Sequence, residues 1–216
     1  MCYERAVPMR LDHDERRTKL AEAVWRVIRR EGVRGASVRG VAREAGLSMG
    51  SVRYFFGTQE ELLHFAMRAV IARATARIQA GASDREALVA RGDAADAAAN
   101  LLEQILPLDE ERLGEAQVWL AFTVQGAVDE GMAGIRQEAD EGVRQLCEKC
   151  VTDLAGLGLV GSDRDIGLEV ERLWSLMDGL TLHILLELGR PSASRTGEIL
   201  RTHLRDLQHP ATSPAS

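Results

Sequence analysis

The sequence predicts an all-α protein in which a small N-terminal domain of three helices precedes a larger helical domain, with about nine helices in all. Two observations predict this fold class. Apolar residues recur at intervals of three and four along most of the 216 residues, which is the period of an amphipathic helix. No segment alternates apolar and polar residues, and no Asn-Gly pair joins two β-branched runs, so no strand or hairpin is expected.

The composition is that of a globular chain with its own core, since 45% of the residues are apolar. No run of about 18 apolar residues occurs, and the start, MCYERAVPMRLDHDERR, lacks the apolar stretch of a signal peptide. Three cysteines are too few for a disulfide framework, which fits a reducing compartment. We therefore expect a cytoplasmic protein with no membrane partner.

The first helix is expected at residues 14–31, and Gly32 ends it. The apolar residues that form one stripe along it are Leu20, Val24, Val27 and Ile28. Arg29 and Arg30 lie off this stripe, where charged side chains are usually solvated.

Two short helices joined by a tight turn are expected at residues 37–56, SVRGVAREAGLSMGSVRYFF. Ser37 and Ser48 precede them, and each hydroxyl is placed to accept a free backbone N–H of the first turn. Gly46 stands where a residue with positive φ ends a helix without steric cost. The residues expected at the crossing of the two helices are Ala42, Val41, Leu47 and Val52. This is the helix-turn-helix pattern.

The second of these helices fits the major groove of B-form DNA, where base edges are read. We expect Arg53 and Arg39 to reach guanine edges, because a guanidinium pairs with guanine through two hydrogen bonds. Phosphate or sugar contacts are expected from Ser37, Ser51, Tyr54 and Phe55. The full set of expected DNA-binding residues is Ser37, Arg39, Ser48, Met49, Gly50, Ser51, Arg53, Tyr54, Phe55 and Gln59.

The net charge of −6 is unevenly divided. Residues 1–56 carry twelve Lys or Arg against seven Asp or Glu, a net +5, while residues 57–216 carry fifteen against twenty-six, a net −11. Basic charge is therefore concentrated where the groove-reading helix is expected, and this distribution favours DNA binding by the N-terminal domain.

In these residues the chain resembles the DNA-binding region of the TetR family of bacterial transcriptional repressors, whose pattern is close to T-x-x-x-I-A-x-x-A-G-[VL]-S-x-G-[TS]-[LV]-Y-x-[HY]-F-x-[SN]-K-[ED]-[ED]-L-L. The chain reads SVRGVAREAGLSMGSVRYFFGTQEELL, and the resemblance covers roughly residues 13–65. Arg53 stands where the family usually has Tyr, Phe55 where it usually has His or Tyr, and Gln59 where a phosphate-contacting Lys is common. The first departure adds a charge at the groove, and the other two alter phosphate contacts.

The resemblance implies a ligand-responsive repressor that binds a palindromic operator in double-stranded DNA as a homodimer. It implies a small-molecule effector, no cofactor and no catalytic residues. The helix after the recognition helix would be the lever through which ligand binding alters the separation of the two DNA-binding domains. The last two long helices would pair across a two-fold axis into a four-helix interface. Arg16 and Arg17 would be phosphate partners.

Six further helices are expected, at residues 59–80, 83–106, 109–128, 131–157, 163–189 and 194–207. Thr58 and Glu61 form a capping box, Pro107 stops the second of the six, and Gly189 and Pro191 end the fifth. The long apolar stripe of that fifth helix fits pairing between two copies and packing inside one copy equally well. The expected domains are residues 1–57, an arm with the helix-turn-helix; residues 58–209, for regulation and dimerisation; and residues 210–216, a disordered tail.

Polar and aromatic residues interrupt the apolar faces of these helices, and a buried polar group needs a partner, which a bound ligand can supply. The expected ligand-binding residues are Trp119, Phe122, Thr123, Trp174, Met177, Asp178 and Thr181. A plain core or interface role fits most of them as well. Asp178 is the residue most in need of a partner, which could be a cationic ligand, an Arg across a dimer, or water.

Cys147 and Cys150 have the C-x-x-C spacing of zinc and redox sites, but no second Cys pair or His pair lies near them in sequence to complete four ligands. A thiol or metal sensor is therefore a minor alternative, and no metal site is assigned. The chain has no phosphate loop and no hydrolase or zinc-protease motif, so no enzyme is expected. The remaining rival is an all-α small-molecule-binding or scaffold protein whose helix-turn-helix no longer binds DNA.

Overall fold

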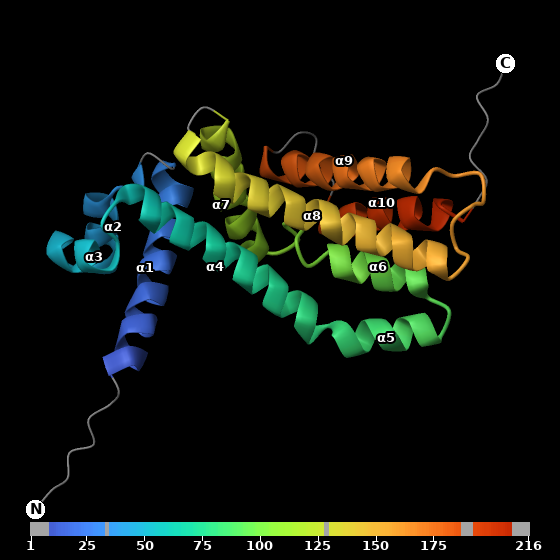
Figure 1. Ribbon diagram of the computed structural model, residues 1–216, viewed down its shortest axis with the longest axis horizontal. Coiled ribbons are helices and arrows are strands. Elements are labelled where there is room, and N and C mark those ends of the chain that lie inside the picture. Colours follow the sequence, from blue (N-terminus) through green and yellow to red (C-terminus); the bar gives the residue numbers. More distant parts are fainter. Residues whose placement is uncertain (1–8, 33–34, 128–129, 187–191, 209–216) are drawn as a thin grey trace, which may run out of the picture. The chain divides into compact units, whose positions relative to one another are not determined.

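A computed structural model describes residues 9–32, 35–127, 130–186 and 192–208. Within these residues every regular element is a helix, as the sequence predicts. The ten helices are α1 (Met9–Glu31), α2 (Val38–Ala45), α3 (Met49–Phe55), α4 (Gln59–Ala80), α5 (Ala82–Ala90), α6 (Ala94–Leu102), α7 (Glu110–Gly126), α8 (Glu130–Gly156), α9 (Ile166–Leu185) and α10 (Ala193–Asp206) (Figure 1). Among them, none combines the length and the apolar character that a membrane span requires. Residues 1–8 of the expected N-terminal arm, the residues Gly189 and Pro191, and the tail at 210–216 lie outside the described residues. Helix α1 begins at Met9, before the expected start at residue 14, and α9 ends at Leu185, before the expected end at residue 189.

The described residues divide into two compact units. The first contains the chain up to Ile71 together with residues 117–136, and the second contains residues 72–116 and the chain from Gln137 onward. All three boundaries fall inside helices, so α4, α7 and α8 each contribute to both units. The domain boundary expected from the sequence, between residues 57 and 58, stays a prediction.

The single helix expected at residues 83–106 is wrong, because the structure divides this segment into α5 and α6. Gly92 adopts a φ of 88°, a left-handed conformation that ends α5. Its backbone N–H donates to the carbonyl of Val89 at 3.0 Å. Gly81 precedes α5, and no side chain caps this helix. This break gives ten helices where about nine were expected.

The core of the second unit lies among α6, α8, α9 and α10. Its buried apolar residues on α9 are Val170, Leu173, Met177 and Leu180. They pack with the buried face of α6, with Val151 and Leu154 of α8, and with Leu200 and Leu204 of α10. The centre of the α9 stripe therefore packs inside a single copy of the chain, rather than between two copies.

The first unit packs the helix pair against α1. The predicted stripe of α1 is confirmed, because Leu20, Val24, Val27 and Ile28 are all buried. Trp25 lies beside this stripe, and its Nε1–H donates to the carbonyl of Ala66 on α4 at 3.1 Å. The helix that follows the pair is thereby tied to the helix that precedes it.

Gly40 lies where α2 passes close to the preceding loop, a close approach that no sequence pattern predicts. A Cβ at this position would lie 2.5 Å from the backbone oxygen of Gly35. We expect Gly40→Ala to lower the free energy of unfolding, because overpacking costs about 1–3 kcal/mol and only about 1 kcal/mol returns through helix propensity. Urea denaturation measures this. Gly142→Ala on α8 is the control: no atom lies within 4 Å of its Cβ position, so stability should rise, and equal behaviour of both variants would contradict the close approach.

Candidate nucleic-acid interface

The helix pair α2–α3 has the caps that the sequence predicts. Ser37 Oγ accepts the backbone N–H of Gly40 at 3.1 Å, and Ser48 Oγ accepts that of Ser51 at 3.0 Å. Gly46 has a φ of 67° and ends α2 in the left-handed conformation. The turn between the helices is closed by the N–H of Leu47, which donates to the carbonyl of Ala42 at 2.9 Å. The turn and both helix starts are therefore fixed by local hydrogen bonds.

The apolar seam behind the pair is confirmed for three of its four residues. Val41, Ala42 and Val52 are buried. Leu47 is 36% exposed, so its expected place in the seam is wrong. Leu47 sits in the turn itself, beyond the end of α2, where the backbone rather than the side chain joins the two helices.

The junction of α3 and α4 also has the predicted capping residues, with one change. Thr58 Oγ1 accepts the N–H of Glu61 at 3.1 Å, as a capping box requires. The carboxylate of Glu61 accepts the N–H of Gly57 at 2.8 Å rather than that of Thr58. The start of α4, with exposed Gln59 as its first residue, is thus held at a fixed point after α3.

Ion pairs on the surface connect α1 to α2. Glu44 accepts hydrogen bonds from Arg26 at 2.7 Å and from Arg30 at 2.9 Å, and the bond from Arg26 is the main cause of the lowered pKa of this carboxyl. Arg43 pairs with Glu31 at 3.3 Å. Arg30 is exposed, as expected, and its charge is compensated within the protein. Such exposed pairs stabilise weakly, but they orient α2 on α1.

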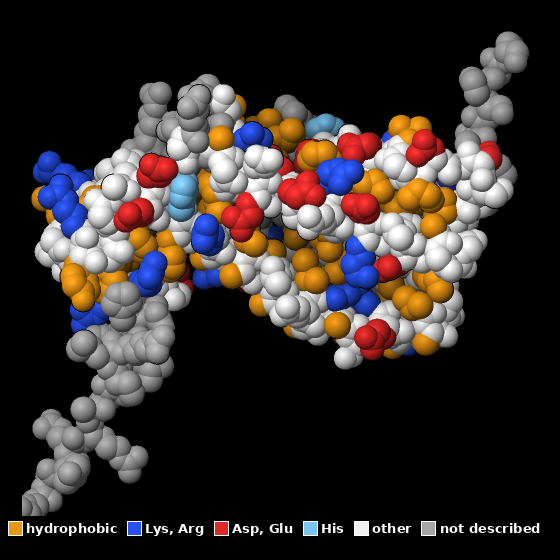
Figure 2. Space-filling model, in the orientation of Figure 1, with side chains coloured by type: hydrophobic (Ala, Val, Ile, Leu, Met, Phe, Trp, Pro, Cys, Tyr) orange, Lys and Arg blue, Asp and Glu red, His pale blue; other side chains and the backbone are white. Residues whose placement is uncertain are grey.

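Two arginines on the outer side of the helix pair have no such compensation. Arg39 on α2 and Arg53 on α3 are exposed, and in the described part of the chain neither forms an ion pair or hydrogen bond. Figure 2 shows Lys and Arg side chains gathered at the α2 and α3 end of the first unit. Both guanidinium groups are therefore available to an anionic partner or a base edge.

The remaining expected DNA-binding residues lie around these arginines. Tyr54 is 77% exposed and packs edge-on against the half-buried Phe55, with ring centroids 5.3 Å apart. Ser48, Met49 and Gly50 are exposed at the start of α3, while Ser37 and Ser51 are half-buried because their hydroxyls cap or adjoin the helices. The α2–α3 pair and the first residue of α4 carry the whole expected set.

Arg17 has a place that periodicity did not predict. Its guanidinium carbon lies 4.7 Å from the ring centroid of Phe65 and 5.4 Å from that of Phe56, which are cation–π distances. Its Nε is buried without a hydrogen-bond partner in the described residues. The two phenylalanines flank the junction of α3 and α4, so Arg17 joins α1 to that junction. The aromatic residues on both sides of Thr58 were the sequence feature from which this contact of Arg17 could have been inferred.

The expected ligand-binding residues fall into both units. On the α7 segment of the first unit, Phe122 is buried, Trp119 is half-buried, and the hydroxyl of Thr123 is buried without a partner in the described residues. In the second unit, on α9, Met177 is buried and Trp174, Asp178 and Thr181 are half-buried. The two sets are described separately, each within its own unit.

The ionised form of Asp178 is disfavoured by its surroundings. Burial raises the pKa of its carboxyl, and the nearby Asp140 raises it further. In the described residues Asp178 forms no ion pair or hydrogen bond. A carboxylate in this position gains from any cation that approaches it.

Cys147 and Cys150 belong to the core of the second unit. Both thiols are free and buried, and burial is the main reason why each pKa is raised to about 12. The described residues contain no group of three or more potential His, Cys, Asp or Glu metal ligands. The surroundings of these thiols are those of inert core cysteines.

Thiol labelling tests this directly in a Cys2→Ser background, where only the two core thiols remain. We expect no reaction with a disulfide reagent at pH 7.5 in the folded protein, because the thiolate fraction of a group with a pKa near 12 is on the order of 10⁻⁵. Both thiols should react after unfolding in guanidinium chloride. Rapid labelling of the folded protein would revive the thiol-sensor alternative.

Comparisons with known proteins agree with this geometry. Residues 20–66 match the family of bacterial regulatory proteins called the tetR family, and residues 94–209 match the C-terminal domain of BetI-type transcriptional repressors. The HTH-type transcriptional regulator PksA of Bacillus subtilis (strain 168) is 35% identical over 201 residues, which cover 93% of this chain and 94% of PksA.

Solved structures show the same fold. A transcriptional regulator from Rhodococcus sp. Rha1 superposes with a TM-score of 0.73 at 29% identity, covering 88% of this chain and 95% of that one. A putative transcriptional regulator from Saccharomonospora viridis, solved in complex with choline, has a TM-score of 0.73 at 25% identity and covers 89% of this chain and 95% of its own. The chain therefore belongs to the TetR family and is a DNA-binding transcriptional regulator.

Proposed function

We propose that this regulator binds a pseudo-palindromic operator as a homodimer, reads it with α3, and is released from it by a cationic small molecule. The observation that carries the DNA-binding part is the pair of exposed, uncompensated arginines, Arg39 and Arg53, on a helix pair whose other charges are paired within the protein. Arg53 is assigned to a guanine edge, and Arg39 to a guanine edge or an adjacent phosphate.

The rest of the interface supplies orientation. Phosphate or sugar contacts are assigned to Ser37, Ser51, Tyr54 and Phe55, with Gln59 at the first turn of α4. Ser48, Met49 and Gly50 form the end of α3 that enters the groove. Arg17 supports these contacts, because its stacking on Phe56 and Phe65 fixes α1 against the junction that precedes Gln59.

Dimerisation is assigned to α9 and α10 of the second unit. A groove of about 530 Å³ there is lined by Leu168, Glu171, Arg172, Ser175, Leu176 and His203. Leu168 is 58% exposed, and the Nε2 of His203 is buried without a partner in the described residues. Burial, and then Arg172, lower the pKa of His203, so the ring is neutral at pH 7. An apolar and polar surface of this kind is completed by the same surface of a second copy.

Operator spacing follows from the dimer. Two copies of α3 related by a two-fold axis reach successive major grooves when they lie about 34–36 Å apart or a multiple of that distance. An effector that prefers the conformation with another spacing releases DNA, and it can shift the equilibrium between the two conformations by no more than its differential affinity for them.

The effector is assigned to the class of organic cations. Asp178 is a half-buried carboxylate without a cationic partner in the described residues, and Trp174 precedes it by one helical turn, so both lie on one face of α9. A carboxylate and an aromatic ring are the groups that recognise quaternary ammonium ions. The similar regulator from Saccharomonospora viridis was crystallised with choline, which is such an ion. The other assigned ligand contacts on this helix are Met177 and Thr181, while Trp119, Phe122 and Thr123 on the α7 segment of the first unit stay predictions.

Asp178→Asn tests the effector assignment. The raised pKa of Asp178 means that ionisation is disfavoured in the folded protein, so the charge lowers stability above the carboxyl titration range. We expect the variant to melt at a higher temperature at pH 7 and to lose the rise in melting temperature that millimolar choline gives the unaltered protein. Asp153→Asn, which removes an exposed α8 carboxylate paired with Lys149, should keep the choline response. Retention of that response by Asp178→Asn would refute the assignment.

Selection of bound duplexes from random DNA, followed by gel shifts at several salt concentrations, tests the proposal as a whole. Specific binding is expected, with an inverted repeat as the enriched sequence and a steep loss of affinity with salt. A protein that enriches no sequence over bulk competitor would instead be an all-α ligand-binding or scaffold protein that has lost DNA recognition.

A further inference from the structure

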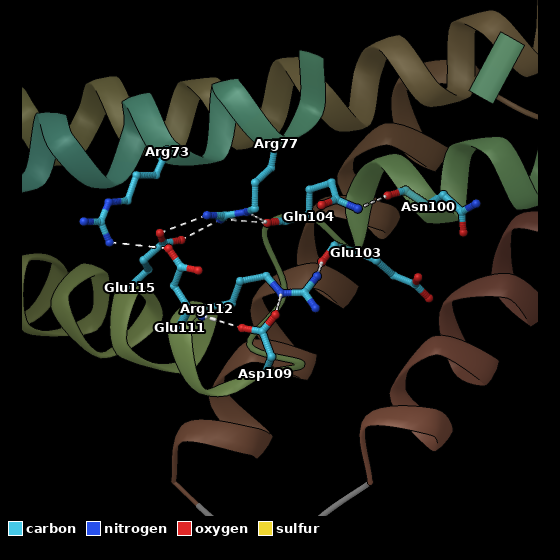
Figure 3. A network of polar contacts seen from close by, with 9 residues as sticks. All are labelled: Arg73, Arg77, Asn100, Glu103, Gln104, Asp109, Glu111, Arg112 and Glu115. Atoms are coloured by element: carbon cyan, nitrogen blue, oxygen red, sulfur yellow. Dashed lines mark hydrogen bonds and ion pairs between the residues drawn. The ribbon is translucent and has the colours of Figure 1, made fainter. Parts of the chain in front are cut away.

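A row of ion pairs joins α4 to α7 inside the second unit (Figure 3). Arg73 and Arg77 lie one turn apart on α4, and Glu111 and Glu115 lie one turn apart on α7. Arg73 Nη1 is 3.4 Å from Glu111 Oε1. Arg77 forms a bidentate pair with Glu115, at 2.9 and 2.6 Å. These two pairs are named the polar ladder.

The Arg77–Glu115 pair of the ladder is largely buried. The side chain of Glu115 is 7% exposed and that of Arg77 is 24% exposed. Arg77 also donates from Nε and Nη2 to the carbonyl of Gln104, at 3.3 and 3.0 Å. The bond to Glu115 is the main cause of the raised pKa of Arg77. A movement of α4 along α7 would break this pair and leave the carboxylate of Glu115 buried without its partner. Such a movement is therefore strongly disfavoured.

The loop before α7 is held by a second set of polar contacts (Figure 3). Arg112 donates from its backbone N–H and its Nε to the carboxylate of Asp109, at 2.8 and 2.9 Å, and from Nη1 to the carbonyl of Glu103 at 2.5 Å. Gln104 Nε2 donates to the carbonyl of Asn100 at 3.0 Å. The beginning of α7 is thereby fixed to the end of α6 as well as to α4.

The two helices of the ladder both continue into the first unit. There, the α4 segment accepts the hydrogen bond of Trp25 through the carbonyl of Ala66. The α7 segment accepts a hydrogen bond from Arg29 Nε through Gln117 Oε1, at 3.0 Å. Arg29 is exposed, as expected, but it also forms this contact, which the sequence did not predict. Helix α1 of the DNA-binding region thus contacts both helices that the ladder joins.

We infer that the polar ladder makes α4 and α7 shift as one body, so that a displacement of α7 reaches the α2–α3 helix pair through α4. The inference rests on the proposed DNA-binding function and adds the residues that carry its regulation. Arg77 and Glu115 are positioning residues, since they act on DNA binding only through α4. A coupling element of this kind has two packed helices that are displaced together rather than past each other.

Amide hydrogen exchange in the presence and absence of a duplex selected by the unaltered protein tests the inference. In that protein, DNA should slow exchange in α3 by contact and in residues 111–116 of α7 by coupling. Arg77→Met/Glu115→Met removes both charges and leaves no lone buried carboxylate. In this variant the slowing in α3 should persist, while that at residues 111–116 should fall to less than about half.

The matched control is Arg201→Met/Glu103→Met, which removes a 2.6 Å ion pair between Arg201 on α10 and Glu103, the residue after α6, in the same unit. It should keep the slowing at residues 111–116. The exposed pair supplies a rescue: Arg73→Glu places two carboxylates together and should weaken the slowing, and Arg73→Glu/Glu111→Arg should restore it. If the Met pair does not fold, as judged by circular dichroism, this rescue decides.

The outcomes separate the two proposals. Unaltered protein that selects no duplex refutes the DNA-binding proposal itself. Unaltered protein that binds DNA without slowing exchange at residues 111–116 refutes only the ladder inference. The ladder inference would also be overturned if both Arg77→Met/Glu115→Met and Arg73→Glu bound DNA normally and kept the full slowing of exchange at residues 111–116.

Discussion

Arg53→Ala is expected to weaken binding to the selected operator about 5- to 150-fold, which corresponds to about 1–3 kcal/mol for loss of a bidentate contact to guanine. The side chain is exposed on α3 and has no ion pair or hydrogen bond in the described residues, so its removal leaves no partner unsatisfied in the protein. The folded state should therefore be unchanged, and the whole effect should appear in DNA binding. Sequence preference should relax at one position of each half-site, which a second round of selection measures.

Arg53→Lys distinguishes a base contact from a phosphate contact. A lysine retains the charge but lacks the planar fork that pairs with guanine through two hydrogen bonds. If Arg53 reads a base, Lys should lose the preference at that position while keeping most of the salt dependence. If Arg53 contacts phosphate, Lys should bind nearly as well as Arg and with unchanged preference. Intact affinity and preference in Arg53→Ala would show that Arg53 does not contact DNA.

Arg43→Ala is the matched control for loss of a positive charge. Arg43 is an exposed arginine of α2, but it is paired with Glu31 and thus has a partner in the protein. Its removal should change affinity uniformly across sequences, if at all. Comparison of the two variants separates sequence readout by Arg53 from the general attraction between a basic domain and DNA.

Features set by neighbouring residues were predictable from the sequence. The caps at Ser37, Ser48 and Thr58 and the left-handed Gly46 depend on a few consecutive residues, and the structure confirms all four. The break at Gly92 was missed because the alanines around it keep the helical pattern on both sides of the glycine. Periodicity records which face of a helix is apolar, and it carries little information where small residues make every face alike.

Contacts between distant segments were not predictable. Thirty-eight residues separate Arg77 from Glu115, and eighty-eight separate Arg29 from Gln117. In the sequence these arginines look like any solvated charge, because the pairing is decided by how α4 and α7 pack. The same holds for Gly40, whose importance depends on the path of the loop at Gly35. The expected DNA contacts stay predictions, since DNA itself is the partner that would define them.

Arg77→Met on its own is expected to lower the free energy of unfolding by about 3 kcal/mol, the lower end of the range for breaking a buried ion pair, because Arg77 is about a quarter exposed. The loss arises less from the missing attraction than from Glu115, which would stay buried with its charge uncompensated. Arg77→Met/Glu115→Met removes that charge too and should recover most of the stability. Urea denaturation of the two variants measures the difference. Equal stability of the single and double variants would mean that the carboxylate of Glu115 finds water or another donor when Arg77 is absent, and the ladder would then be too weak to fix α4 on α7.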